Sequence, residues 1–289
     1  MKTGLILEGG AMRGLFTAGV MDVMMEHGIT FDGVIGVSAG AAFGCNYKSG
    51  QIGRVIRYNT RFCTDKRYSG LGVLLREGNL FSTPFCYDEV PNKYDPFDYD
   101  AYSQSPVEFY VVCTDVETGK PVYHRYEGRE DHGLDWIRAS ASMPLVSQIV
   151  EIDGQKLLDG GISDSVPVRY FESIGYERNV VILTQPQGYI KKKNPLIPLM
   201  KMKYSQYPDM VNTMAKRHTE YNENLAYIER QENVGKLLVI RPDQPLNIRK
   251  AEKNPAELER VYEIGRRVGS RRLEEIQKYL AVEESNEET

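Results

Sequence analysis

The apolar positions at the start of the chain follow two different periods. A short apolar run at residues 5–7 predicts a buried strand, and apolar side chains then recur at spacings of three and four over residues 16–24, which predicts a helix. A second strand is predicted at residues 31–37, and small residues begin another helix at 38–42 with no room for a loop between them. This order of strand, glycine-rich loop, helix, strand and helix predicts the opening of a mostly parallel α/β sheet.

The middle of the chain mixes irregular and β-rich segments. Residues 60–106 are rich in Tyr, Phe, Pro and Asp with weak periodicity, which predicts loops and short helices over the body. Two hairpins are predicted at 107–126 and 149–158, separated by a helical segment at 134–141. An almost wholly apolar run at 179–184 is typical of a central parallel strand.

The composition changes after residue 190. A Lys- and Met-rich stretch leads into a long helical pattern ending near residue 232, and a short strand then precedes a charged helix that ends near residue 280. We therefore predict three parts, which are an α/β domain at residues 1–190, a mainly helical C-terminal extension at 191–282 and a disordered acidic tail at 283–289.

Composition excludes several classes of function. The 289 residues suffice for one α/β domain with an extension, and a net charge of −4 gives no reason to expect a nucleic-acid partner. The four cysteines (Cys45, Cys63, Cys86 and Cys113) form no CxxC pair, and no histidine has metal-ligand spacing, so we expect reduced thiols and neither metal nor cofactor. No apolar run is long enough for a secretory signal or a membrane span. We expect a cytoplasmic protein, with peripheral contact at the inner membrane face left open, and the sequence does not indicate an oligomeric state.

A G-x-S-x-G pattern lies where the second predicted strand meets the next helix, and Gly36, Ser38 and Gly40 are its fixed positions. Strand and helix leave no loop between them, which would place Ser38 on a strained turn as an exposed nucleophile. A serine N-cap on an ordinary βα turn explains the same residues equally well when the pattern is taken alone.

A glycine-rich loop lies one helix earlier in the chain. Gly9, Gly10 and Gly14 let the backbone approach a ligand, and the following helix begins with free N–H donors. Neighbouring strands of a parallel sheet would bring these donors beside Ser38, where an oxyanion forms in acyl transfer. A nucleotide-phosphate loop is the weaker interpretation, because the run lacks both the full G-x-G-x-x-G and a following Lys-Ser or Lys-Thr.

An acidic residue, Asp159, leaves a third apolar run into a glycine turn formed by Gly160 and Gly161. Catalytic carboxylates often lie at the carboxyl ends of strands in such sheets. For an isolated Asp-Gly, an aspartate that supports its own turn through its side chain is the simpler interpretation.

These three segments in this order resemble the patatin-like phospholipase family. Residues 138–144 (Arg-Ala-Ser-Ala-Ser-Met-Pro) are similar to that family's Ala-Ser-x-x-x-Pro segment, and residues 114–119 (Thr-Asp-Val-Glu-Thr-Gly) are similar to its hairpin motif. The resemblance covers about residues 4–184, and the part after residue 191 resembles the helical extension of bacterial members less closely.

The resemblance implies a three-layer α/β/α fold, a Ser38–Asp159 dyad and calcium-independent hydrolysis of lipid esters of the phospholipase A or lysophospholipase type. It also implies an oxyanion hole of backbone N–H groups, which belong to Gly9, Gly10, Ala11, Met12 and Arg13. Ala11 stands where many members have a third glycine, so the loop must hold a conformation that an L-residue accepts. For the Arg13 side chain we favour a structural ion pair over contact with an anionic headgroup.

In the dyad mechanism Asp159 accepts the Ser38 proton, an acyl-enzyme forms, and Asp159 then activates water. Burial should help, because a solvated carboxylate with a pKa of ~4 is a poor base.

A Ser-His-Asp triad is the rival mechanism, since His218 follows Asp159 in the chain. However, His218 lies inside a helical pattern rather than on a loop after a strand. We therefore treat all four histidines as structural. An acyltransferase with the same nucleophile and a non-catalytic lipid-binding protein are the remaining alternatives.

Two segments have possible contacts with lipid. Residues 191–204 combine lysines with apolar side chains and could adsorb to anionic lipid, although a solvated linker with a buried anchor is slightly favoured. The aromatic stretch at 81–102 is a candidate acyl-chain wall or lid, and core packing explains it equally well.

Overall fold

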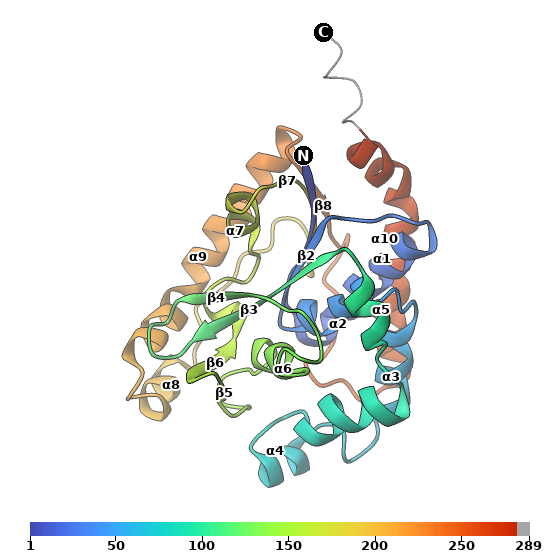
Figure 1. Ribbon diagram of the computed structural model, residues 1–289. Helices are drawn as coiled ribbons and strands as arrows, with labels where there is room; N and C mark the ends of the chain where they lie inside the picture. The colour runs from blue at the N-terminus through green and yellow to red at the C-terminus, as the bar shows by residue number, and fades with distance from the viewer. Residues whose placement is uncertain (282–289) are drawn as a thin grey trace.

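The computed structural model describes residues 1–281, and within them an eight-stranded sheet forms the centre of the molecule (Figure 1). The predicted tail at 283–289 lies outside the described residues. The strands are β1 (Lys2–Leu7), β2 (Gly33–Val37), β3 (Glu108–Asp115), β4 (Pro121–Arg125), β5 (Val150–Ile152), β6 (Gln155–Asp159), β7 (Tyr176–Ile182) and β8 (Leu237–Ile240). Their order is β5-β6-β3-β2-β1-β7-β8, with β4 on the other edge of β3. β1, β2, β3, β7 and β8 are parallel, so the predicted parallel sheet is confirmed.

Helices fill most of the connections between these strands. The α-helices are α1 (Gly14–Glu26), α2 (Ala39–Lys48), α3 (Arg54–Phe62), α4 (Leu71–Glu77), α5 (Tyr99–Gln104), α6 (Asp135–Ser140), α7 (Val168–Ser173), α8 (Ile197–Lys203), α9 (Pro208–Asn233) and α10 (Pro255–Ala281). Two 3₁₀ turns, η1 (Ala11–Arg13) and η3 (Gly160–Ile162), follow β1 and β6, and η2 (Phe85–Tyr94) is a π-helix.

Helices cover both faces of the sheet, which gives the three layers that the resemblance implies (Figure 1). Side chains alternate along each strand, so neighbouring residues face opposite layers. Leu5 and Leu7 pack in a cluster with residues of α1 and α10, whereas Ile6 packs in a second cluster with residues of α7 and α9. The central strands are buried on both faces, as their continuous apolar sequence predicts.

The C-terminal part contributes to the same sheet. β8 pairs in parallel with β7 and so extends the sheet by one strand. α10 packs on α1 at a glycine crossing, because a Cβ at Gly19 would lie 2.2 Å from the Tyr262 carbonyl oxygen. The Tyr262 hydroxyl also donates to Asp22 of α1 over 2.6 Å. The boundary that we place at residue 190 stays a prediction, but residues beyond it share the core with residues before it.

Charged residues occur along both α9 and α10. Across residues 1–281, none of the helices has both the length and the apolar character required to cross a bilayer.

Candidate active site

Ser38 and Asp159 meet because β2 and β6 share one edge of β3. β2 pairs with β3 as far as Val37, which lies opposite Val112. β6 begins its pairing at the next residue of β3, since Asp159 lies opposite Cys113. β4 occupies the other edge along both stretches. β6 runs antiparallel to β3, so the carboxyl ends of β2 and β6 point at each other, rather than side by side as a purely parallel sheet would place them.

The two side chains are in direct contact. The Ser38 hydroxyl donates to Oδ2 of Asp159 over 2.7 Å, and the Gly161 N–H donates to Oδ1 over 2.8 Å. Asp159 therefore supports its own turn with one oxygen and holds Ser38 with the other. Burial raises the pKa of the Asp159 carboxyl, and the bonds from Ser38 and Gly161 and the charge of Arg217 oppose that rise.

Ser38 occupies a strained turn between β2 and α2. Its φ of 55° and ψ of −119° lie in a region that L-residues seldom adopt. Close packing enforces the turn, because a Cβ at Gly36 would lie 2.5 Å from the Gly40 carbonyl oxygen and one at Gly40 would lie 2.4 Å from the Leu7 oxygen. The geometry is that of a nucleophile elbow and differs from an ordinary βα turn.

Ser140 fixes this turn, and sequence reasoning gave it no role. The Ser38 N–H donates to the Ser140 hydroxyl oxygen over 2.8 Å, and that hydroxyl donates to the Val112 carbonyl over 2.6 Å. Ser140 is fully buried, so its hydroxyl is committed to these two bonds. The available signal was the segment at 138–144 that resembles a family motif, but the contact partner lies 102 residues away.

The glycine-rich loop lies against Ser38, as predicted. A Cβ at Gly9 would lie 3.0 Å from the Cβ of Ser38. Within residues 1–281 the N–H groups of Gly9, Gly10 and Ala11 donate to no other group, so they are free to bind an anion. The Arg13 N–H instead donates to the Gly10 carbonyl over 3.1 Å, so the prediction that Arg13 supplies an oxyanion donor is wrong.

Four further residues complete the surroundings of Ser38. Met12 is buried and lines the cavity in front of Ser38. Ala39, the first residue of α2, has no acceptor within its own helix for its N–H, and an N–H directly after the nucleophile is a usual oxyanion donor. Close packing recurs beside it, since a Cβ at Gly14 would lie 2.9 Å from the Cβ of Ala39. A Cβ at Gly160 would lie 2.1 Å from the Val112 carbonyl oxygen.

Ala11 holds a backbone conformation that favours glycine. Its φ is 48°, whereas Gly10 before it is extended at 179°. We expected the loop to hold Ala11 in a conformation that an L-residue accepts, and this expectation is wrong. The backbone of Ala11 is strained instead. The expected ion pair of Arg13 is also wrong, because in the described part of the chain its side chain has no ion pair and its buried Nε has no hydrogen-bond partner.

Glu8 anchors the loop from behind and was not recognised in the sequence. Its carboxylate is buried and accepts hydrogen bonds from the Tyr221 hydroxyl and from the Thr184 N–H and hydroxyl. Tyr221 belongs to α9, so the C-terminal part helps to position the loop. The Lys191 ammonium lies 4.1 Å from the centre of the Tyr221 ring, and burial lowers the pKa of Lys191 to about 8.

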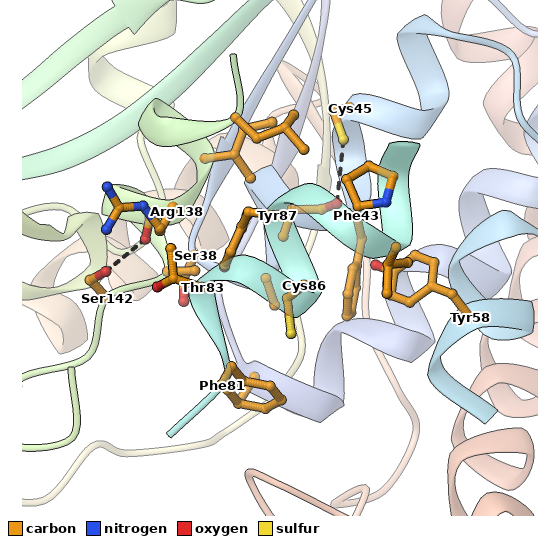
Figure 2. A pocket seen from close by; sticks show the side chains of 18 of the residues that line it. Ser38, Phe43, Cys45, Tyr58, Phe81, Thr83, Cys86, Tyr87, Arg138 and Ser142 are labelled. Carbon is orange, nitrogen blue, oxygen red and sulfur yellow. Dashed lines mark hydrogen bonds between the residues drawn. The ribbon is translucent and has the colours of Figure 1, made fainter. Parts of the chain in front are cut away.

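A mainly apolar cavity of about 140 Å³ opens in front of Ser38 (Figure 2). Side chains of α2, η2 and the segment after α6 line it. The volume is close to the ~150 Å³ of an apolar protein cavity that accepts benzene, so a hydrocarbon group fits. The aromatic stretch predicted as an acyl-chain wall supplies Phe81, Tyr87 and Phe97 to the lining. Tyr102, at the end of that stretch, is instead fully buried in the core.

The histidines have other partners. The rings of His27, His124 and His132 contact the Val23 carbonyl, Asp131 and Asp153 respectively. His218 lies in α9, and its buried Nδ1 has no partner in residues 1–281. No histidine of the described chain hydrogen-bonds to Ser38 or Asp159, and the same residues contain no cluster of acidic, cysteine or histidine side chains suited to a metal ion.

Comparison with known proteins gives two family matches. Residues 5–172, which include Ser38 and Asp159, match the family described as "Patatin-like phospholipase". Residues 207–281 match a domain described only as of unknown function.

Several individual proteins are similar to the chain. An uncharacterized protein of Escherichia coli strain K12, YjjU, is 30% identical over 96% of this chain and 79% of its own length. The lysophospholipase nte1 of Emericella nidulans is 25% identical over 99% of this chain, which spans only 19% of the fungal protein. An uncharacterized NTE family protein of Mycobacterium tuberculosis is 28% identical over 63% of this chain and 48% of its own length. Among solved structures, VipD from Legionella pneumophila covers 95% of this chain with 12% identity and a TM-score of 0.46.

Proposed function

Since the chain belongs to the patatin-like phospholipase family, we propose that it hydrolyses acyl esters of phospholipids or lysophospholipids through a Ser38–Asp159 dyad. The observation that carries the proposal is the 2.7 Å hydrogen bond from the Ser38 hydroxyl to Asp159 at the edge of an apolar cavity. The name of the fungal relative, a lysophospholipase, agrees with this class of substrate.

The first half of the reaction forms an acyl-enzyme. Oγ of Ser38 attacks the ester carbonyl carbon while its proton moves to Oδ2 of Asp159. The free N–H groups of Gly9, Gly10 and Ala11, with that of Ala39, would bind the negative charge that develops on the carbonyl oxygen, and the contact of Gly9 with Ser38 supports this role. Cleavage of the ester bond then transfers the proton from Asp159 to the departing alcohol, which is the glycerol-headgroup part of the lipid.

The second half restores the enzyme. Water attacks the acyl carbon, its proton moves to Asp159, and the fatty acid leaves as Ser38 regains its hydrogen. Burial of Asp159 raises its pKa and makes it a stronger base than a solvated carboxylate. In this mechanism no histidine is required.

Hydrolysis of p-nitrophenyl butyrate and of a lysophospholipid by wild type and single variants tests the proposal. We expect Ser38→Ala and Asp159→Asn each to lower kcat by roughly 10⁴-fold or more, which is the range that removal of single members of a catalytic triad spans. His218→Ala is the matched control and should retain kcat within about twofold. Loss of activity in His218→Ala would establish a triad instead, and an inactive wild type would favour a lipid-binding protein. Transfer of the acyl group to an added alcohol in place of water would identify an acyltransferase.

A further inference from the structure

The short helix α4 presents apolar side chains to solvent. Leu71 and Leu75 lie one helical turn apart and are 70% and 80% exposed. Val73 on the opposite side is fully buried and holds the helix to the body. Isolated exposed leucines are ordinary, but two on one face of a helix form a patch that water does not favour.

The helix α8 and the residue before it repeat this arrangement. Leu196, Leu199 and Met202 follow one another at intervals of three residues and are 49%, 44% and 72% exposed. Ile197 and Met200 face inward and pack in a buried cluster. α8 is therefore anchored by one apolar face and exposes a second one.

One loop joins the two helices into a continuous rim. The Leu80 N–H donates to the Val146 carbonyl over 2.7 Å, which ties the end of the α4 segment to the loop at 143–148. The Leu145 N–H donates to the Tyr204 hydroxyl over 2.9 Å, which ties the same loop to the end of α8. In Figure 1, α4 lies at the bottom of the molecule and α8 at its lower left, both in the half away from the N-terminus.

This rim borders the mouth of the cavity in front of Ser38. Asn79, Phe81 and Met143 line the cavity and are only half-buried, and they lie on the same segments that form the rim. The lining residues Phe43 and Val90 are buried and form its deep end. The open end of the cavity therefore lies at the segment after α4 and at the loop at 143–148, which contacts the end of α8.

The rim is also positively charged. Four lysines on or beside α8 are exposed, and within residues 1–281 none of them has an ion-pair partner; they are Lys192, Lys193, Lys201 and Lys203. The chain as a whole has a net charge of −4, so this local excess of cations is not a general property of its surface. Unpaired lysines beside exposed apolar side chains are typical of segments that adsorb to anionic bilayers.

We propose that α4 and α8 are two membrane anchors that place the mouth of the cavity on an anionic phospholipid bilayer. The proposal rests on the proposed function, since a lipid acyl chain is what the cavity would receive. The exposed apolar side chains enter the acyl-chain boundary while the lysines remain among the phosphates. An ester near the membrane surface then reaches Ser38 without its chain crossing water.

Vesicle flotation with the full chain tests this proposal. The Ser38→Ala background prevents hydrolysis during the measurement, and the vesicles contain phosphatidylcholine and phosphatidylglycerol in equal parts. We expect the pair Leu71→Gln and Leu75→Gln, and separately the pair Leu199→Gln and Met202→Gln, to lower the partition coefficient by roughly tenfold each. Lys192→Gln with Lys193→Gln should lower it roughly fivefold per lysine, and pure phosphatidylcholine should abolish that difference.

A matched control pair lies at the opposite edge of the sheet. Ile174 and Val234 are exposed apolar residues just before β7 and β8, so they lie at the amino ends of these strands, away from Ser38. Ile174→Gln with Val234→Gln should leave vesicle binding unchanged. The proposal would be overturned if this pair lowered vesicle binding as much as the α4 and α8 pairs do, or if the α4 and α8 pairs did not lower it. It would also be overturned if the α4 and α8 variants changed only the self-association of the protein, measured by light scattering. Hydrolysis of p-nitrophenyl butyrate by the same variants with Ser38 intact tests the proposed function separately.

Discussion

The Ser38 backbone N–H donates to the hydroxyl oxygen of Ser140 over 2.8 Å, so a residue of α6 sets the orientation of the proposed nucleophile. The Ser140 hydroxyl in turn donates to β3 through the Val112 carbonyl. The strained turn at Ser38 is thereby held from a separate element, which keeps its hydroxyl aimed at Asp159.

Ser140→Ala should therefore impair both folding and catalysis. The substitution leaves the Ser38 N–H buried without an acceptor, which costs about 1–3 kcal/mol in the free energy of unfolding. A looser turn should lower kcat by about tenfold with little change in KM, because Ser140 does not line the cavity. Urea unfolding and ester hydrolysis measure the two effects. Ser173→Ala is the control, since the Ser173 hydroxyl only donates to the Tyr170 carbonyl of its own helix and Ser173 does not line the cavity, so both effects should be small.

Ala11→Gly should stabilise the protein. A positive φ of 48° costs an alanine about 1–2 kcal/mol, and glycine adopts it freely, so we expect a net gain of about 1 kcal/mol after the larger chain entropy of unfolded glycine is included. The N–H donor is retained, so hydrolysis should not fall. Urea unfolding measures the gain. Ala226→Gly is the control with the opposite expected effect. Ala226 is exposed within α9, where glycine should lower the free energy of unfolding by about 1 kcal/mol. A destabilised Ala11→Gly variant would contradict the strain that the structure shows.

The acid limb of the pH profile should report Asp159. In the proposed mechanism only the ionised carboxylate accepts the Ser38 proton, so kcat/KM should fall as pH drops through the Asp159 pKa, which burial raises above 3.8. The limb should lie above the usual range for aspartate and should not move in His218→Ala. The profile on a soluble ester measures it. A limb that shifts in His218→Ala would mean that a histidine, and not Asp159, is the titrating base.

The sequence predicts most of the elements correctly because their signals are local. The glycine loop, the elbow at Ser38 and the turn at Asp159 each depend on residues within a few positions of one another. What it could not predict depends on register between distant segments. Asp159 reaches Ser38 because β6 pairs with β3 directly beyond the end of β2 and runs antiparallel to β3. No periodicity within residues 155–159 indicates that β6 runs antiparallel. The bond between Glu8 and Tyr221 likewise spans 213 residues.

The side chain of Asp164 makes stability depend on pH in an unusual direction. Asp164 lies in the turn after Asp159 and lines a second cavity, of about 470 Å³, whose walls include Arg169 and Glu220. Burial raises its pKa to about 6, against an ordinary value of 3.8, although the Tyr123 hydroxyl donates to it over 2.8 Å. The folded state thus holds a proton that the unfolded state releases between these two values.

The free energy of unfolding should therefore decrease as pH rises from about 4 to 6, because over this range the unfolded state binds fewer protons at Asp164 than the folded state does. That difference in pKa corresponds to roughly 3 kcal/mol. Asp164→Asn carries no titrating group and can still accept the Val166 N–H, so its stability relative to wild type should rise across this window and level off above it. Urea unfolding at a series of pH values measures the difference. A flat difference for Asp164→Asn would mean that Asp164 titrates at its ordinary pKa in the folded protein.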